Sequence, residues 1–153
     1  MALLARAPLP LLEHALQSYE SARKTEWLRR PETGLYMVQG RAGGTGDRFN
    51  LGEITVTRCA LRRRTHEATD TPVGVAYVLG RNHRQAELAA VADALLQEPA
   101  QQAILTERLL TPVRQHLAHQ AAQRQMRAQA TKVDFFTVAR ETGSGDDGEE
   151  DEA

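Results

Sequence analysis

Cysteine is nearly missing from this chain, since Cys59 is the single one in 153 residues. A lone cysteine excludes an internal disulfide framework, a cysteine-based zinc finger and iron–sulfur ligation within the chain. Long apolar runs are missing too, because no stretch reaches the ~18 apolar residues of a membrane span. The apolar start, residues 1–12, contains Arg6 and lacks a basic beginning, which is atypical of a secretion signal. We therefore expect a cytoplasmic protein with no membrane partner.

Large apolar residues are scarce as well. Aromatic residues make up 5% of the chain, and Leu, Ile, Val and Phe together account for 32 residues. That share is just above the roughly 20% below which charged chains tend to stay disordered. Alanine supplies much of the remaining apolar content and buries little area per residue. We predict one domain over residues 1–140 with a thin core, and a partner that covers part of its apolar surface.

Charge is unevenly distributed, although the formal net charge is only −1. Residues 141–153 hold seven acids and no base, which predicts a disordered acidic tail. Of the 19 basic residues only Lys24 and Lys132 are lysine, and arginine suits bidentate contacts to phosphate and carboxylate. The cluster Arg62–Arg64 lacks interleaved aromatic residues and the pI is about 6.5. We therefore expect no nucleic-acid partner.

Hydrophobic periodicity and turn residues predict the elements of the first half. Apolar positions three and four apart predict a helix over Leu11–Arg23. Strands are expected at Glu26–Arg29, Leu35–Arg41, Phe49–Arg62 and Val73–Leu79, with a turn at Arg30–Gly34 and a flexible loop at Arg62–Pro72. The second and third of these strands form a predicted hairpin.

Helices dominate the predicted second half. Asn82 with Gln85 three residues later has the spacing of a capping box, ahead of an apolar stripe formed by Leu88, Val91, Ala92, Leu95 and Leu96. Pro99 and Pro112 each suit the first turn of a further helix. One helix, then strands, then helices indicates an α+β fold: a small antiparallel sheet with helices packed on one side, an N-terminal helix and a C-terminal helical segment.

A glycine-dense loop, Gly40–Arg48, is the first candidate for chemistry. The amides of Gly43, Gly44 and Gly46, with the Thr45 hydroxyl and the flanking Arg41 and Arg48, suit an anion such as a phosphate or phosphonate. The spacing matches neither a P-loop nor a dinucleotide fingerprint. The alternative interpretation is a hairpin loop in which glycines supply positive φ. The sequence leaves both open.

No catalytic constellation is evident. The histidines are scattered, and although His116 and His119 are three apart, no carboxylate stands beside them at helical spacing, so we predict no metal site. Cys59 sits in a strand pattern and is better explained as a small core residue than as a nucleophile. We therefore assign no catalytic residue.

Several segments together resemble a known family. The run from Arg30 to Arg58, RPETGLYMVQGRAGGTGDRFNLGEITVTR, closely resembles the PhnG family of the bacterial carbon–phosphorus lyase system. The segments Tyr77–Arg81, Ala86–Gln97 and Thr131–Thr137 also fit, the last with the ending Val-Asp-Phe-Phe-Thr. The resemblance spans roughly residues 24–140.

The resemblance implies a function in phosphonate metabolism. A PhnG-like chain would act with PhnH, PhnI and the ATPase-like PhnL in transferring ribose 5-triphosphate from ATP to methylphosphonate, with adenine displaced. It would share a core complex with PhnH, PhnI and PhnJ, and PhnJ would later break the carbon–phosphorus bond. The chain itself would be an accessory subunit, inactive alone and without a cofactor of its own, with ATP as substrate of the complex.

Two other functions stay open at this point: a non-enzymatic scaffold that stabilises a partner subunit, and a small free-standing anion-binding protein. The C-terminal segment bears on partner binding. Phe135 and Phe136 are adjacent, so in an extended segment they point to opposite sides and one small domain can hardly bury both. We predict that Phe135, Phe136 and Val133 contribute to a partner interface.

Overall fold

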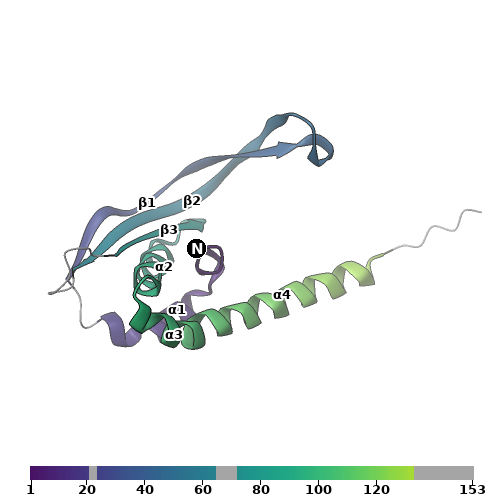
Figure 1. Cartoon of the computed structure of the whole chain (residues 1–153). Helices are drawn as coiled ribbons and strands as arrows, with labels where there is room; N and C mark the ends of the chain where they lie inside the picture. Colours follow the sequence, from purple (N-terminus) through teal and green to yellow (C-terminus); the bar gives the residue numbers. More distant parts are fainter. Residues whose placement is uncertain (21–23, 65–71, 133–153) are drawn as a thin grey trace, which may run out of the picture.

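The computed structural model describes residues 1–20, 24–64 and 72–132. In chain order the elements are η1 (Leu4–Arg6), α1 (Leu9–Glu20), β1 (Lys24–Arg41), η2 (Ala42–Gly44), β2 (Arg48–Arg64), β3 (Val73–Leu79), α2 (His83–Leu96), α3 (Pro99–Leu105), the π-helical turn η3 (Thr106–Leu110) and α4 (Thr111–Ala130). The strands form an antiparallel sheet in the order β1-β2-β3, with the helices on one side (Figure 1). The predicted α+β fold is confirmed. The acidic tail, residues 141–153, lies outside the described residues.

Strand β1 corrects one prediction. The turn expected at Arg30–Gly34 does not form, and residues 24–41 run as one strand paired with β2. The register shifts between Arg29 and Glu32, and Pro31 lies inside this shift. Proline cannot donate to a strand ladder, but it is tolerated at a bulge of an edge strand, and β1 is an edge strand. Pairing with β2 therefore overrides the local turn signal.

Strand β2 corrects a second prediction, because it continues past Arg62 and includes Arg63 and Arg64, which were expected in a loop. The guanidinium of Arg63 forms a partly buried ion pair with Glu98, the residue that precedes α3. This ion pair ties the end of the sheet to the helical layer. The rest of the predicted flexible loop, residues 65–71, lies outside the described residues.

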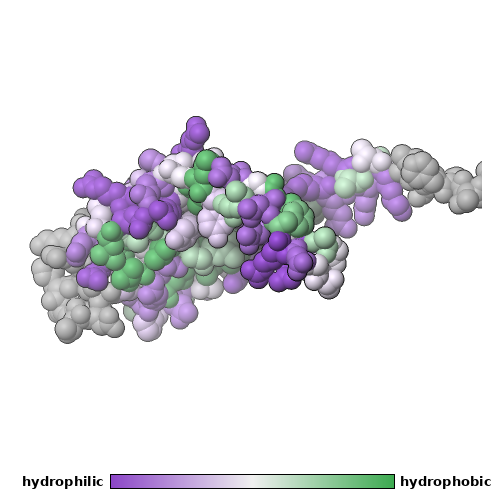
Figure 2. Space-filling model, turned by 90° about the horizontal axis from the view of Figure 1, so that it is seen from above, coloured by the Kyte–Doolittle hydropathy of each residue, from purple (hydrophilic) through white to green (hydrophobic). Residues whose placement is uncertain are grey.

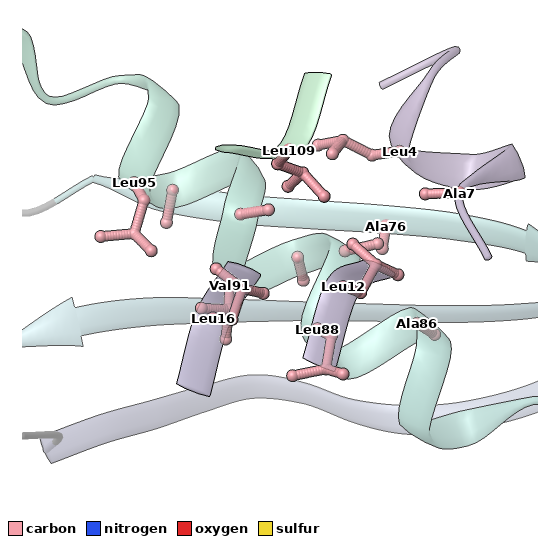
Figure 3. Packing of buried hydrophobic residues seen from close by; sticks show 14 of the residues in the cluster. Leu4, Ala7, Leu12, Leu16, Ala76, Ala86, Leu88, Val91, Leu95 and Leu109 are labelled. Carbon is pink, nitrogen blue, oxygen red and sulfur yellow. The ribbon is translucent and has the colours of Figure 1, made fainter. Parts of the chain in front are cut away.

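Helix α2 lies directly against the sheet, and α1 and α3 lie on its far side (Figure 1). Helix α2 has buried side chains on both sides, because the sheet covers one side and α1 and α3 cover the other. Leu12 and Leu16 of α1 pack beside Leu88 and Val91 of α2 (Figure 3). On the sheet side α2 presents alanines, and a Cβ added at Gly74 of β3 would lie 1.9 Å from the Ala90 carbonyl oxygen. A glycine is therefore required at this crossing.

The start of α2 forms as predicted, with one difference. The side chain of Asn82 accepts a hydrogen bond from the Gln85 amide at 3.0 Å, so Asn82 is the N-cap. The side chain of Gln85 does not complete a capping box, because its amide donates instead to the Ala7 carbonyl oxygen at 2.9 Å. Gln85 thereby attaches the N-terminal segment to α2.

Asp93 of α2 and Gln97, the residue that caps the C-terminal end of α2, bind the free edge of β3. Asp93 accepts a hydrogen bond from the Val75 amide at 3.1 Å, and Gln97 donates to the Val73 carbonyl oxygen at 2.8 Å. An uncovered edge invites pairing with another chain, so these two bonds protect that side of the sheet.

Residues 99–130 form consecutive helical segments. Pro99 and Pro112 lie in the first turns of α3 and α4, as predicted. Since Pro112 has no amide hydrogen and its ring crowds the preceding turn, the π-helical turn η3 stands just before it. After the buried Val113, α4 is largely exposed and extends away from the body, as does the β1–β2 hairpin (Figure 1). Within the described ranges no helix is long and apolar enough to cross a membrane.

Candidate functional site

The predicted loop residues lie together at the tip of the β1–β2 hairpin. The ladder continues to Arg41, which pairs with Arg48, and directly opposite residues in an antiparallel pair project on the same face. The two arginines therefore flank the tip on one side of the hairpin. Figure 1 shows that the tip extends well beyond the helical layer. The described helices do not cover this loop.

The glycines of the loop have conformational roles. Gly43 and Gly44 adopt φ values of 58° and 81°, a region that favours glycine. The amide of Gly46 donates to the Ala42 carbonyl oxygen at 2.9 Å, and a Cβ added at Gly46 would lie 2.9 Å from the same oxygen. In this conformation the Gly46 amide is engaged within the loop and does not face outward as an anion donor.

The two arginines differ in their surroundings. Arg41 donates from Nη1 to the Gly46 carbonyl oxygen at 3.1 Å and so helps to hold the loop. The side chain of Arg48 is exposed and makes no ion pair or hydrogen bond with the described part of the chain. Exposed cations attract anions weakly in water, and the attraction grows when a second surface excludes solvent. Thr45 and Arg48 are both exposed at the tip and accessible from solvent.

Other sequence candidates do not converge on the tip. His14 lies on α1, His83 opens α2, and His116 and His119 lie on the exposed part of α4. In the described ranges no three His, Cys, Asp or Glu side chains are close enough to hold a metal ion. Val133, Phe135 and Phe136, the predicted interface residues, lie outside the described residues.

Cys59 lies in the core, 1% exposed, and its thiol donates to the Ala86 carbonyl oxygen at 3.1 Å. Burial raises the pKa of this thiol to about 12, with a smaller contribution from the Glu87 charge. The thiolate, which is the nucleophilic form, is thus disfavoured. The prediction that Cys59 is a core residue is confirmed.

A polar cluster links the sheet to the start of α2. The Thr33 hydroxyl lies 3.1 Å from the Thr57 hydroxyl and 2.9 Å from His83 Nε2, and Thr57 donates to the Gly80 carbonyl oxygen at 2.6 Å. Thr57 is fully buried, and its proton is committed to that carbonyl. The cluster holds β1, β2 and the start of α2 together, and Thr57 is not available as a nucleophile. Sequence reasoning missed it, because pairing and packing bring its distant members together.

The outer face of the sheet, opposite α2, holds a hollow of about 390 Å³. Its lining includes Gly34, Tyr36, Val56, Arg58 and Tyr77. Beside it the Glu32 carboxylate accepts hydrogen bonds from Arg29 at 2.5 Å and Arg58 at 2.8 Å. These bonds lower the pKa of Glu32, which stays ionised at neutral pH.

Comparison with known proteins shows the family of this chain. A family model described as phosphonate metabolism protein PhnG matches residues 1–141. The chain belongs to the PhnG family. A curated relative from Rhizobium meliloti (strain 1021), named alpha-D-ribose 1-methylphosphonate 5-triphosphate synthase subunit PhnG, is 42% identical over 140 residues. The alignment covers 92% of this chain and 86% of the relative.

Membership of the PhnG family confirms the resemblance drawn from the Arg30–Arg58 run and the Val-Asp-Phe-Phe-Thr ending. The family match begins at residue 1 and so extends beyond the segments that carried the resemblance. The structure gives a reason for this extension. Leu4, Ala7 and Leu12 are buried, so the N-terminal segment is part of the core of this PhnG-family chain.

Proposed function

We propose that the chain is a subunit of an alpha-D-ribose 1-methylphosphonate 5-triphosphate synthase and acts there as an accessory component. The observation that carries this proposal is the 42% identity, over nearly the whole chain, to a relative bearing that name. The partners we propose are PhnH, PhnI and PhnL for the transfer, and PhnJ as a further member of the core complex.

The proposed reaction sets the chemical demands. A phosphonate oxygen bonds to C1 of the ATP ribose while the bond from C1 to adenine breaks, and adenine leaves with the bonding electrons and is protonated. The reaction needs a bound triphosphate, a positioned phosphonate, and stabilisation of the charge at C1. It also needs a proton for the departing base.

This chain meets few of those demands by itself. Cys59 is buried and protonated, and Thr57 is committed to a carbonyl oxygen. The exposed guanidinium of Arg48 is suited to a phosphate or phosphonate oxygen. We therefore propose that other chains supply the catalytic groups, with ATP as their shared substrate, and that the hairpin tip contributes positive charge.

Adenine release tests the proposal. The purified chain mixed with ATP and methylphosphonate should release no adenine, and release should begin when PhnH, PhnI and PhnL are added. In that mixture Arg48→Ala should lower the rate roughly 10- to 150-fold, as expected for loss of a charged hydrogen bond of ~1.5–3 kcal/mol in the transition state. Release by the isolated chain would refute the accessory role.

A matched control separates chemistry from scaffolding. Arg114 lies on the exposed part of α4, away from the hairpin, so Arg114→Ala removes the same charge at a remote place. The Arg114 variant should retain the full rate. If the Arg48 variant also retained the full rate in an intact complex, the tip would have no role in the reaction and the chain would act as a scaffold.

A further inference from the structure

The sheet has two faces, and described helices cover only one of them. Thr57, Cys59 and Leu61 of β2 face α2 and are buried. The alternate residues of the same strands point the other way, to the face seen from above in Figure 2. We call this second surface the outer face.

The outer face is rich in exposed apolar side chains. The register aligns Gly34 with Val56 and Leu79, aligns Tyr36 with Ile54, and places Tyr77 opposite Arg58. Tyr36 is 63% exposed, Tyr77 53% and Leu79 66%. Phe49 and Leu51 continue the apolar surface toward the tip of the hairpin, and both are exposed. Figure 2 shows apolar side chains among polar ones along this face.

The exposed apolar area of this face is comparable with the largest patch of a typical monomer. At about 150–250 Å² per aromatic side chain, the exposed parts of Tyr36, Tyr77 and Phe49 amount to roughly 250–400 Å². The aliphatic side chains beside them add to that area. The largest apolar patch of a typical monomer is about 300–600 Å², whereas a standard protein interface takes about 800 Å² from each partner. The aromatic side chains alone thus match the largest patch of a typical monomer, which is often a functional surface, and the aliphatic side chains extend it.

Gly34 gives an independent indication of an occupant. A glycine weakens a strand unless a turn, a bulge or a close approach requires it. The φ of Gly34 is not positive, and an added Cβ would meet nothing within 4 Å in the described ranges, so neither backbone strain nor crowding by described residues explains the glycine. Gly34 lines the hollow together with Tyr36, Tyr77 and Arg58, and its lack of a side chain leaves that space open. A side chain of another molecule that enters the hollow explains why position 34 carries no side chain of its own.

From these observations we infer that the outer face is the docking surface for another protein chain of the synthase, with the hollow above Gly34 as its anchor pocket. The inference rests on the function proposed above. The partner side chain that fills the hollow is aromatic or branched and apolar, and a carboxylate of the partner lies near it. A small ligand explains less, since the apolar surface continues along the hairpin to Phe49, well past the hollow.

Charge favours a different chain over a second copy. Arg29 and Arg58 share the carboxylate of Glu32, which leaves one positive charge in excess at the rim of the hollow. In a two-fold pair, residues near the axis meet their own copies, so joining two hollows would bring two such positive rims together. A partner carboxylate compensates that charge where a second copy does not.

Filling the hollow tests the inference. The full chain carrying Gly34→Trp, co-expressed with PhnH, PhnI and PhnJ, should bind its partners at least about 30-fold more weakly, as for loss of a buried anchor. Gly34→Ala is the graded control: its Cβ meets nothing in the described part of this chain and takes only a small part of the hollow, so it should weaken binding much less than Gly34→Trp. Normal binding by the Trp variant, with unchanged thermal unfolding, would overturn the inference.

A second pair of variants tests the face apart from the hollow. Leu79→Asp places a charge on the outer face, whereas Ile104→Asp places one on α3, where Ile104 is 43% exposed. Only the Leu79 variant should lose partner binding. Equal effects of the two would overturn the inference, and this pair applies even if the Gly34→Trp chain fails to fold.

Tyrosine labelling identifies the occupant. Tyr36 and Tyr77 should be modified readily in the isolated chain and protected in the complex, with the half-buried Tyr19 as internal reference. Protection in the dilute isolated chain would assign the face to the chain's own C-terminal segment. Protection that rises with chain concentration would assign it to a second copy, and protection by ATP alone would assign it to a nucleotide. Each of these results, or exposure in the complex, would overturn the inference.

Failure of the inference and failure of the proposed function are distinguishable. If wild-type chains assemble and release adenine while the Gly34→Trp and Leu79→Asp variants bind normally, the docking surface is wrong and the function stands. If wild-type chains assemble but release no adenine, the function is wrong whatever the face binds.

Discussion

Replacing Gly74 by alanine adds one methyl group at the crossing of β3 and α2. The added Cβ would lie 1.9 Å from the Ala90 carbonyl oxygen and 2.9 Å from the Ala94 Cβ. The nearer atom belongs to the helix backbone, so no rotamer change relieves the overlap and α2 must move away from the sheet. Overpacking of this kind costs about 1–3 kcal/mol. For a chain of this size that corresponds to a fall of roughly 2–12 °C in the unfolding midpoint.

The same substitution at Gly34 provides the control. There the added Cβ meets nothing in the described part of the chain. Alanine has fewer backbone conformations than glycine in the unfolded chain, so the substitution should stabilise the folded state by about 0.4–1 kcal/mol. The midpoint of thermal unfolding, followed by circular dichroism, should therefore be lower than wild type for Gly74→Ala and slightly higher for Gly34→Ala. If Gly74→Ala unfolds at or above the wild-type temperature, α2 does not pack on β3 as closely as described.

Three further predictions concern the cap, the thiol and the surface ion pair. Asn82→Ala should destabilise the chain by about 1 kcal/mol, seen as a lower urea midpoint, whereas Asn82→Asp should keep the cap; equal loss in both would contradict the capping role. Cys59, with its pKa raised to about 12, should react with iodoacetamide at pH 8 only after unfolding, as measured by mass; rapid labelling of the native chain would contradict its burial. Glu32→Gln should remove a contribution to stability that is present above the ordinary carboxyl pKa of 4.5. Since hydrogen bonds from Arg29 and Arg58 lower the folded pKa, the difference in unfolding midpoint should vanish as the pH falls through that lowered value; a difference independent of pH would refute the assignment.

Elements with a strong internal pattern were predictable from the sequence. Val73–Leu79 alternates between buried and more exposed residues as a half-covered strand should, and α2 begins at its predicted cap. The Arg30–Gly34 turn was wrong because Pro31 and Gly34 carry turn signals that are purely local. The long-range ladder to β2 outweighs those signals and absorbs Pro31 in a register shift.

The candidate sites also differ in how far apart their residues lie in the sequence. Arg41, Gly43 and Arg48 are close in sequence, so a hairpin brings them together whatever the rest of the fold does. Tyr36 and Tyr77 are 41 residues apart, and only the register through Arg58 and the choice of face by α2 place them around one hollow. Alternation shows that a strand has two faces, but it does not tell which face the helices will cover.

The contact between α1 and α2 has a consequence for synthesis of the chain. Leu16 leaves the ribosome first, and its neighbours Leu88 and Val91 follow more than 70 residues later. At about 5–20 residues per second, the apolar side of α1 waits roughly 4–14 s for its partner helix. The β1–β2 hairpin needs only neighbouring residues and can pair during that interval. The nascent chain thus exposes the apolar side of α1 while the β1–β2 hairpin is already paired. Chaperone binding protects such a state against aggregation.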